Sequence, residues 1–446
     1  MTQAQERSVS ARTEASIPHE ASLAKGYMNQ GKPLALYLWF IYAFVALWPL
    51  RFYVTELSFI SLGQLAVIIP AFLCLLYENA FSSYGTKDDL LVLLWVFFIA
   101  ANSFIQGILQ HDAALQLIQL RSLGTSLLII LPYFVSRSIR LGRYKGTFIH
   151  CLLVGMAILV LYKTYWFLGQ YLTSGNAMRA GRATVAQRYP VVINFVFLAA
   201  LLFEAKAKWR RGLAFCVASL SLLLMVVSLT RGAYLAIVID YIILVCVRPK
   251  KIIGFTVLLI VLLSGMSVQY REEMAPLWRA VKSRVEFTVE TAKNPAIDES
   301  AYDRIAMWKT ILDTNLASPL AFLFGSGELG IGQLGKTAKG FRGDFVVGSA
   351  HSQYFDALTR RGVVGLALFL IVLYRMVRVA WRLRHDGQYG WFYTALAVGF
   401  IAVVAYDLFE ESFRFMTFGL FFYAMYGMLV SEGQSLKGKD VPDRLC

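Results

Sequence analysis

Apolar runs of about twenty residues recur along this chain, and each is long enough to cross a hydrocarbon core of roughly 30 Å as a helix. Hydrophobic residues make up 58% of the 446 residues and charged residues only 16%, whereas a soluble domain carries about 25% charged residues. The sequence therefore predicts an all-α, polytopic membrane helical bundle. We expect about twelve transmembrane helices, at 33–51, 57–78, 88–108, 121–139, 147–170, 189–205, 212–229, 232–248, 252–270, 361–380, 391–409 and 414–430.

The basic residues of the short connections predict the orientation. Lys and Arg gather in alternate loops, at 137–145, 206–211 and 248–251, as they do in cytoplasmic loops. With an even number of helices, both termini are expected in the cytoplasm. The expected organisation is a cytoplasmic tail at 1–32, nine membrane helices within 33–270, a long external loop with amphipathic helices at 271–360, three further helices within 361–430, and a cytoplasmic tail at 431–446.

The formal net charge of +15 does not indicate a nucleic-acid partner, because the basic residues lie in short clusters between apolar runs. Four of the five cysteines lie within apolar runs, so neither a disulfide framework nor a Cys-x-x-Cys site is predicted. No cluster of histidines and carboxylates falls on the external side, so no metal and no cofactor is expected. Membrane lipids are the expected surroundings.

Several arginines oppose the topology rule. Arg179, Arg182 and Arg188 lie in one external loop, and Arg231 lies in the short turn SLTRGAY. Each alone fits a headgroup anchor or a snorkelling helix end, but several on one face favour an anion site. Arg231 is held at the membrane surface by its short turn, where a planar guanidinium suits a lipid-linked phosphate or pyrophosphate.

The long loop contains one helical pattern and one glycine-rich stretch. Ile305, Trp308, Ile311 and Leu312 follow helical spacing, with Arg304 at the start, so an amphipathic helix lying on the bilayer or the bundle is predicted. The following FGSGELGIG lacks the phosphate-binding P-loop pattern, and no strand precedes it. We expect it to be a flexible connector.

His351 opens the stretch HSQYFDALTRRG, which is expected to be helical and to lead into the next span. A lone histidine is more often structural than catalytic, but this one lies on the external face with arginines expected at the same depth. A neutral imidazole there can take a proton from a hydroxyl.

Four carboxylates are further candidates. Asp240 lies near the middle of an expected span, where a carboxylate is costly and often functional. Asp407, Glu410 and Glu411 lie at an external helix end, where they could orient a histidine or an acceptor sugar, or be plainly solvated.

Three motifs resemble the O-antigen ligase and polymerase superfamily of bacterial envelope glycosyltransferases. They are T-R-G at 230–232; Arg304 four residues before Trp308, followed by P-x-x-F-x-F-G-x-G at 319–327; and H-S-Q-Y-F-x-x-L-x-x-x-G at 351–362. No single motif is specific to this superfamily, but the order of the three motifs, their spacing and their common external side are specific. The resemblance covers roughly residues 190–430.

This resemblance implies a glycosyltransferase at the periplasmic face of a Gram-negative inner membrane. Its donor would be a glycan on undecaprenyl pyrophosphate. In the ligase branch the acceptor is the sugar core of lipid A-core, and transfer is inverting and needs no metal. By position, Arg231 and Arg304 would hold the pyrophosphate, with Arg179, Arg182 and Arg188 assigned to the same site. His351 would be the base or a phosphate ligand.

Other functions stay open at this point. The polymerase and protein O-oligosaccharyltransferase branches share the architecture, but the repeated R-x10-G loops of polymerases and the longer C-terminus usual in protein-modifying members are absent. A transporter of lipid-linked sugar would place charge at the membrane midplane, where only Asp240 is found. A scaffold would explain neither the external arginines nor His351.

Overall fold

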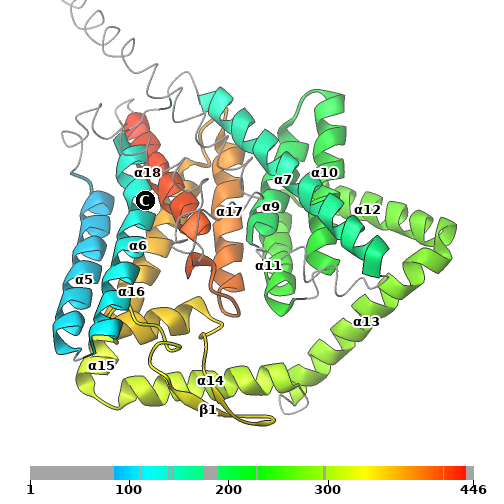
Figure 1. The fold of residues 1–446 in the computed structure, drawn as a ribbon. Coiled ribbons are helices and arrows are strands. Elements are labelled where there is room, and N and C mark those ends of the chain that lie inside the picture. Colours follow the sequence, from blue (N-terminus) through cyan, green and yellow to red (C-terminus); the bar gives the residue numbers. More distant parts are fainter. Residues whose placement is uncertain are drawn as a thin grey trace, which may run out of the picture.

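The structure is a computed structural model that describes residues 85–437, with gaps at 111, 139–140, 142–144, 175–188, 228–229, 295–297 and 415. The expected helices at 33–51 and 57–78 lie outside the described residues, as do the expected N-terminal tail and most of the C-terminal one. Among the described residues, the bundle in Figure 1 is made of the apolar helices α5 (Lys87–Leu109), α6 (Ala113–Ser138), α7 (Lys145–Ser174), α9 (Tyr189–Glu204), α10 (Lys208–Val227), α11 (Arg231–Val247), α12 (Pro249–Gln269), α16 (Gln353–Leu383), α17 (Gly390–Tyr406) and α18 (Met416–Lys437).

The helical membrane character predicted from the sequence is confirmed. Within the described residues, six helices are long and apolar enough to cross a membrane, namely α5, α6, α7, α10, α12 and α16, and α11 and α17 contain shorter apolar helices. Together they indicate a multi-pass membrane protein. The number of about twelve spans stays a prediction.

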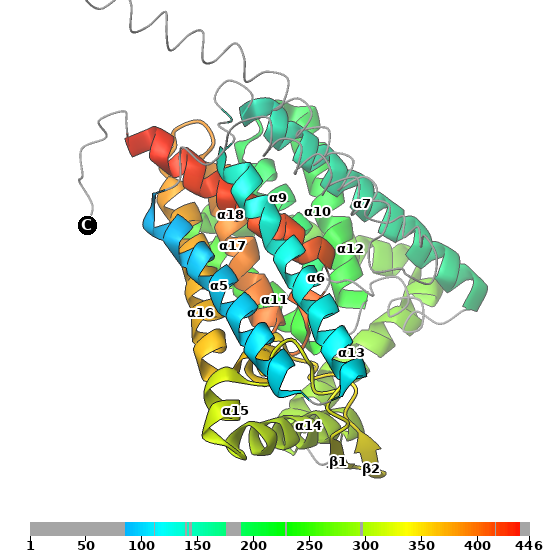
Figure 2. The ribbon, with the colours of Figure 1, turned by 60° about the vertical axis from the view of Figure 1, so that its left-hand side comes forward.

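Aromatic side chains fill the centre of the bundle. Helix α18 packs along α6, α17 packs against α9 and α11, and α16 packs against α5, α17 and α18 (Figures 1 and 2). Trp95, Tyr133, Phe392, Phe400 and Tyr426 are almost completely buried among these helices. In a membrane bundle such side chains stabilise the core through van der Waals packing between the helices.

The segment between α12 and α16 lies largely at one end of the bundle, which we call the loop end (Figure 1). It consists of helices α13 (Arg271–Lys293), α14 (Glu299–Leu316) and α15 (Pro319–Phe324) and strands β1 (Thr337–Gly340) and β2 (Gly343–Val346). The strands pair antiparallel, with Thr337 opposite Val346. The all-α prediction missed this hairpin, because strands of four residues carry too little periodicity to detect.

Helix α14 confirms the expected amphipathic helix but buries a shifted face. Asp298 caps its first turn by accepting a hydrogen bond from Ser300 N. Met307 and Ile311 are buried in a small second core, whereas Ile305 and Leu312 are exposed. The expected apolar stripe is therefore only partly correct, because the hairpin and the residues before α16 cover the neighbouring face.

Two glycines interlock the end of α15 with α16. Gly362 interrupts α16 at φ 60°, and a Cβ on it would lie 2.3 Å from the carbonyl carbon of Leu323. Gly325 has φ 70°, and its Cβ would lie 2.5 Å from the carbonyl carbon of Arg360. Only glycine permits both this backbone conformation and this approach.

The glycine-rich stretch 324–332 is consequently a packed segment, and its prediction as a flexible connector is wrong. Ser326 N donates to the carbonyl of Thr359 at 2.8 Å, and Glu328, Leu329 and Ile331 are buried. The glycines here allow close backbone contacts, which the sequence pattern cannot distinguish from flexibility.

Candidate functional site

His351 is fixed in an unusual backbone conformation directly before α16. Its φ is 47°, and it is the only non-glycine residue with a positive φ among the described residues. Its backbone N–H donates to Glu411 Oε1 at 2.7 Å, while its side chain is exposed. A left-handed conformation costs a histidine energy, so such outliers persist only where their surroundings hold them.

The turn 407–411, which follows α17, holds the start of α16. Gln353 N donates to the carbonyls of Asp407 and Glu410 at 3.0 and 2.9 Å. With the Glu411 contact to His351, two backbone N–H groups at the helix start are satisfied by this one turn. Glu411 thus contacts His351 through the backbone of the histidine, and a role in orienting its imidazole stays a prediction.

Helix α14 brings Arg304 to the same turn. Arg304 is half-buried, and its Nη1 donates to the carbonyl of Phe409 at 3.4 Å. One helical turn later, Trp308 Nε1 donates to the carbonyl of Ala350 at 2.9 Å, and its ring stacks on Phe355 with 5.0 Å between ring centroids. Arg304 and His351 therefore flank one turn, although 47 residues separate them in sequence.

Helix α11 begins at Arg231, close to the same turn. A Cβ on Gly232 would lie 3.0 Å from the ring of Tyr406, the last residue of α17, so the two helices approach closely at this point. The side chain of Arg231 lies outside the described part of the structure. The segment containing Arg179, Arg182 and Arg188 lies outside it entirely.

Asp240 and Asp407 are among the buried carboxyl groups whose hydrogen bonding is incomplete within the described residues. Asp240 lies in the middle of α11, fully buried, with neither carboxyl oxygen hydrogen-bonded. Asp407 accepts a bond from Ser412 N at 3.1 Å through Oδ1, whereas its Oδ2 has no partner. Burial raises the pKa of Asp407 well above its usual value, and the neighbouring Glu410 and Glu411 add to this.

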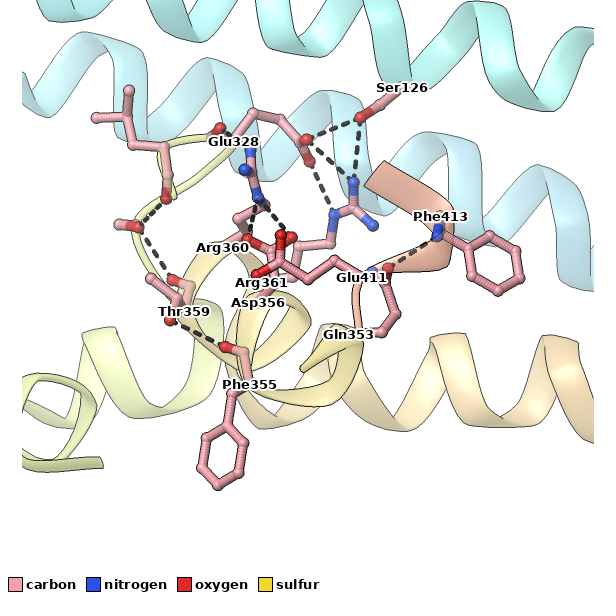
Figure 3. Close-up of polar contacts among 12 residues, drawn as sticks. Ser126, Glu328, Gln353, Phe355, Asp356, Thr359, Arg360, Arg361, Glu411 and Phe413 are labelled. Carbon is pink, nitrogen blue, oxygen red and sulfur yellow. Dashed lines mark hydrogen bonds and ion pairs between the residues drawn. The ribbon is translucent and has the colours of Figure 1, made fainter. Parts of the chain in front are cut away.

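Sequence reasoning missed a second polar group, at the first two turns of α16 (Figure 3). Arg361 Nε and Nη2 donate to the two carboxylate oxygens of Glu328 at 2.8 and 3.0 Å, and Ser126 on α6 donates to the same carboxylate at 2.8 Å. Arg360 pairs with Asp356 at 2.9 Å and also donates to the carbonyl of Glu328. We call Glu328, Asp356, Arg360 and Arg361 the loop-end cluster.

The loop-end cluster is charge-balanced. Burial of the Glu328 side chain would raise its pKa, but the charge and hydrogen bonds of Arg361, with the charge of Arg360, hold that pKa below its usual value. The adjacent arginines in TRRG were the available signal, since two guanidiniums at the predicted start of a span need partners. Glu328 could not be paired with them from sequence spacing.

The described residues contain no group of three or more His, Cys, Asp or Glu side chains that could hold a metal ion. No curated protein matches the chain. Residues 215–370, from α10 into α16, match the family model described as O-Antigen ligase. This match includes Arg231, Arg304, the glycine-rich stretch and His351, and it is consistent with the predicted resemblance to the O-antigen ligase and polymerase superfamily.

Proposed function

We propose that this protein is an O-antigen ligase that transfers a glycan from undecaprenyl pyrophosphate to the sugar core of lipid A-core at the periplasmic face of the inner membrane. The observation that carries the proposal is the turn 407–411, which holds His351 through Glu411 and Arg304 through the carbonyl of Phe409. A base and a cation held on one rigid turn suit a transfer in which a proton and a negative charge must both be accommodated.

In this reaction the acceptor hydroxyl oxygen attacks the anomeric carbon of the donor glycan. The bond between that carbon and the pyrophosphate oxygen breaks with inversion, and the electron pair leaves with undecaprenyl pyrophosphate. His351 takes the hydroxyl proton. Arg304 and Arg231 stabilise the charge that develops on the pyrophosphate, which guanidiniums do well because they stay charged and bind two oxygens.

The backbone geometry supports the role of His351 as the base. Its imidazole is exposed while its main chain is fixed, so the ring can reach a substrate without moving the helix. The competing role is a direct contact of the imidazole with a phosphate oxygen. The two roles predict different losses when His351 is removed. A base is needed for transfer to a hydroxyl but not for binding the donor, whereas a phosphate contact is needed for binding the donor.

The test is glycan transfer by the purified full-length protein in detergent, supplied with undecaprenyl-pyrophosphate glycan and lipid A-core, with and without EDTA. We expect transfer in both conditions. Arg304→Ala should lower kcat by about 10²- to 10³-fold, whereas Lys309→Ala, an exposed cation on the same helix, should not.

Arg231→Ala should also lower transfer, with Arg248→Ala at the other end of α11 as its matched control. Growth of the glycan chain, or glycosylation of a protein, in place of transfer to lipid A-core would reassign the protein to a sister branch. Unchanged transfer in Arg304→Ala and Arg231→Ala would contradict the proposed pyrophosphate site.

A further inference from the structure

A cavity of about 460 Å³ lies at the loop end between α5, α6 and α16, beside the short 3₁₀ helix η4 (Ser412–Arg414) that precedes α18. Its volume falls within the range of about 300–1,000 Å³ that is usual for ligand sites. Neither His351 nor Arg304 lines it. The transfer chemistry proposed above therefore leaves this cavity without a role.

Two polar helix faces confront each other across the cavity. Helix α6 contributes the hydroxyls of Ser122, Thr125 and Ser126, and α16 contributes Gln353, Asp356 and Arg360. Both sets are spaced three or four residues apart, so each forms one continuous helix face. The cavity is thus built from regular elements rather than from mobile side chains on a loop.

The cavity is polar and exposed at its mouth and apolar at its floor. Arg121 and Gln333 at the mouth are exposed, whereas Trp95, Ile99 and Phe369 on the lining are no more than 3% exposed. Hydroxyl, amide and charged groups on one side and aromatic or aliphatic surface on the other match a sugar, whose hydroxyls need hydrogen bonds and whose ring carbons need apolar contact.

The charges of the lining favour neutral hydroxyl groups over an anion. Two of the three arginines, Arg360 and Arg361, are already paired with Asp356 and Glu328. An anionic ligand entering beside them would meet two carboxylates as well as two guanidiniums. Alternating donors and acceptors instead suit vicinal hydroxyls, which both give and receive hydrogen bonds.

The cavity and the proposed pyrophosphate site are formed by different residues around the turn 407–411. Arg304 reaches Phe409 from α14, and α11 approaches the turn at Tyr406, whereas Gln353 and Phe413, hydrogen-bonded to each other, face the cavity. The charge of Glu411, which holds His351, also acts on Arg360 in the cavity wall. A two-substrate transfer needs such flanking sites.

We infer that this cavity binds the core sugars of the acceptor. This inference rests on the proposed function. Thr125→Trp fills the cavity from α6. Leu117→Trp places the same side chain on the exposed face of the same helix, where Leu117 is 68% exposed, and serves as the control. Gln333→Ala removes an exposed amide from the mouth with little risk to folding.

Two measurements on the purified full-length protein test the assignment. The first is the dependence of transfer on lipid A-core and on donor concentration. We expect Thr125→Trp to raise the acceptor KM at least tenfold and Gln333→Ala to raise it severalfold, with the donor KM unchanged in both and Leu117→Trp like wild type. The second is calorimetric binding of the soluble core oligosaccharide released from lipid A, which should be lost in Thr125→Trp.

The outcomes separate the two proposals. If the wild-type protein binds the oligosaccharide but shows no transfer, and Thr125→Trp loses this binding, the sugar site in the cavity is supported and the ligase proposal is overturned. Normal transfer with unchanged acceptor KM and binding in Thr125→Trp and Gln333→Ala would overturn the cavity assignment alone. A raised donor KM, or competition of inorganic pyrophosphate for the cavity, would also overturn it by giving the cavity to the donor.

Discussion

The two ends of the bundle hold buried clusters of the same composition, two arginines and two carboxylates, but they are built differently. At the end away from the loop, Arg375 binds Asp88 through two bonds of 2.8 Å, and Arg137 binds Asp89 at 2.9 Å. We call these four residues the opposite-end cluster. Tyr426 and Tyr133 donate to the same two carboxylates at 2.7 Å.

The opposite-end cluster is assembled from helices alone, and its carboxylate oxygens are filled by phenol hydroxyls. It therefore joins α5, α6, α16 and α18. The loop-end cluster instead receives Glu328 from the packed glycine-rich stretch and lines the 460 Å³ cavity. The same ionic chemistry can therefore close one end of a bundle and shape a cavity at the other.

The largest stability effect is expected at the opposite-end cluster. Arg137→Met retains much of the side-chain volume but leaves Asp89, which is 1% exposed, without its cation. Breaking a buried pair from one side costs about 3–5 kcal/mol. Thermal unfolding in detergent should show a large loss of Tm, whereas Arg382→Met, an exposed arginine at the same end, should not. An unchanged Tm in Arg137→Met would contradict the role of this cluster as a closure.

The glycine contact at the loop end should give the next largest effect. Gly362→Ala adds a Cβ that would lie 2.3 Å from the Leu323 backbone, so its cost should exceed the roughly 1–2 kcal/mol of a left-handed conformation alone. Gly335→Ala is the control, since Gly335 has φ 60° and nothing within 4 Å of its Cβ. Equal Tm losses for the two variants would mean that the close contact is unimportant.

Glu328→Gln should destabilise the protein by about 1–3 kcal/mol, because Arg361 loses its charge partner but keeps an acceptor. The native pKa of Glu328 is lowered, so its stabilisation is complete above the unfolded carboxyl pKa of about 4.3 and is lost as pH falls through the native value. The Tm difference between wild type and Glu328→Gln should therefore shrink in acid. Unlike Arg137→Met, this variant should also raise the acceptor KM.

The smallest effect, with the opposite sign, is expected for Asp407→Asn. Because burial raises the native pKa of Asp407, the ionising unfolded state is favoured as pH rises above about 3.9. The Asn variant avoids this cost, so its Tm should equal or exceed that of wild type at neutral pH. This advantage should disappear below about pH 4. A lower Tm for Asp407→Asn than for wild type at neutral pH would contradict the buried neutral carboxyl.

The helices were largely predictable because apolar runs report membrane spans directly. The run at 88–108 corresponds to α5, and the closely spaced runs at 212–229 and 232–248 are indeed two helices, α10 and α11. The run at 361–380 covers only part of α16, and the polar stretch before Gly362, which was predicted to be helical, forms the first turns of the same helix. The hairpin was too short to detect.

The site was predictable only where a single residue carries the chemistry. His351 and Arg304 could be singled out because each stands out on its own, and the structure brings both to the turn 407–411. Their roles in transfer stay predictions. The loop-end cluster and the cavity were not found, because they combine residues from 95 to 423 whose meeting depends on packing. Glycines also mislead, since the sequence does not distinguish a flexible glycine from one required by a close contact.

Chemistry at the loop end of α16 is tested most directly by comparing the two histidines that flank this helix. His351 lies before its first residue, and His385 lies just after its last one, also exposed. Transfer to lipid A-core should be measured for His351→Ala and His385→Ala, after thermal unfolding has shown that both variants have the Tm of wild type. We predict that His351→Ala lowers kcat by about 10²- to 10⁴-fold and that His385→Ala does not. Full activity in His351→Ala would contradict a catalytic role for this histidine.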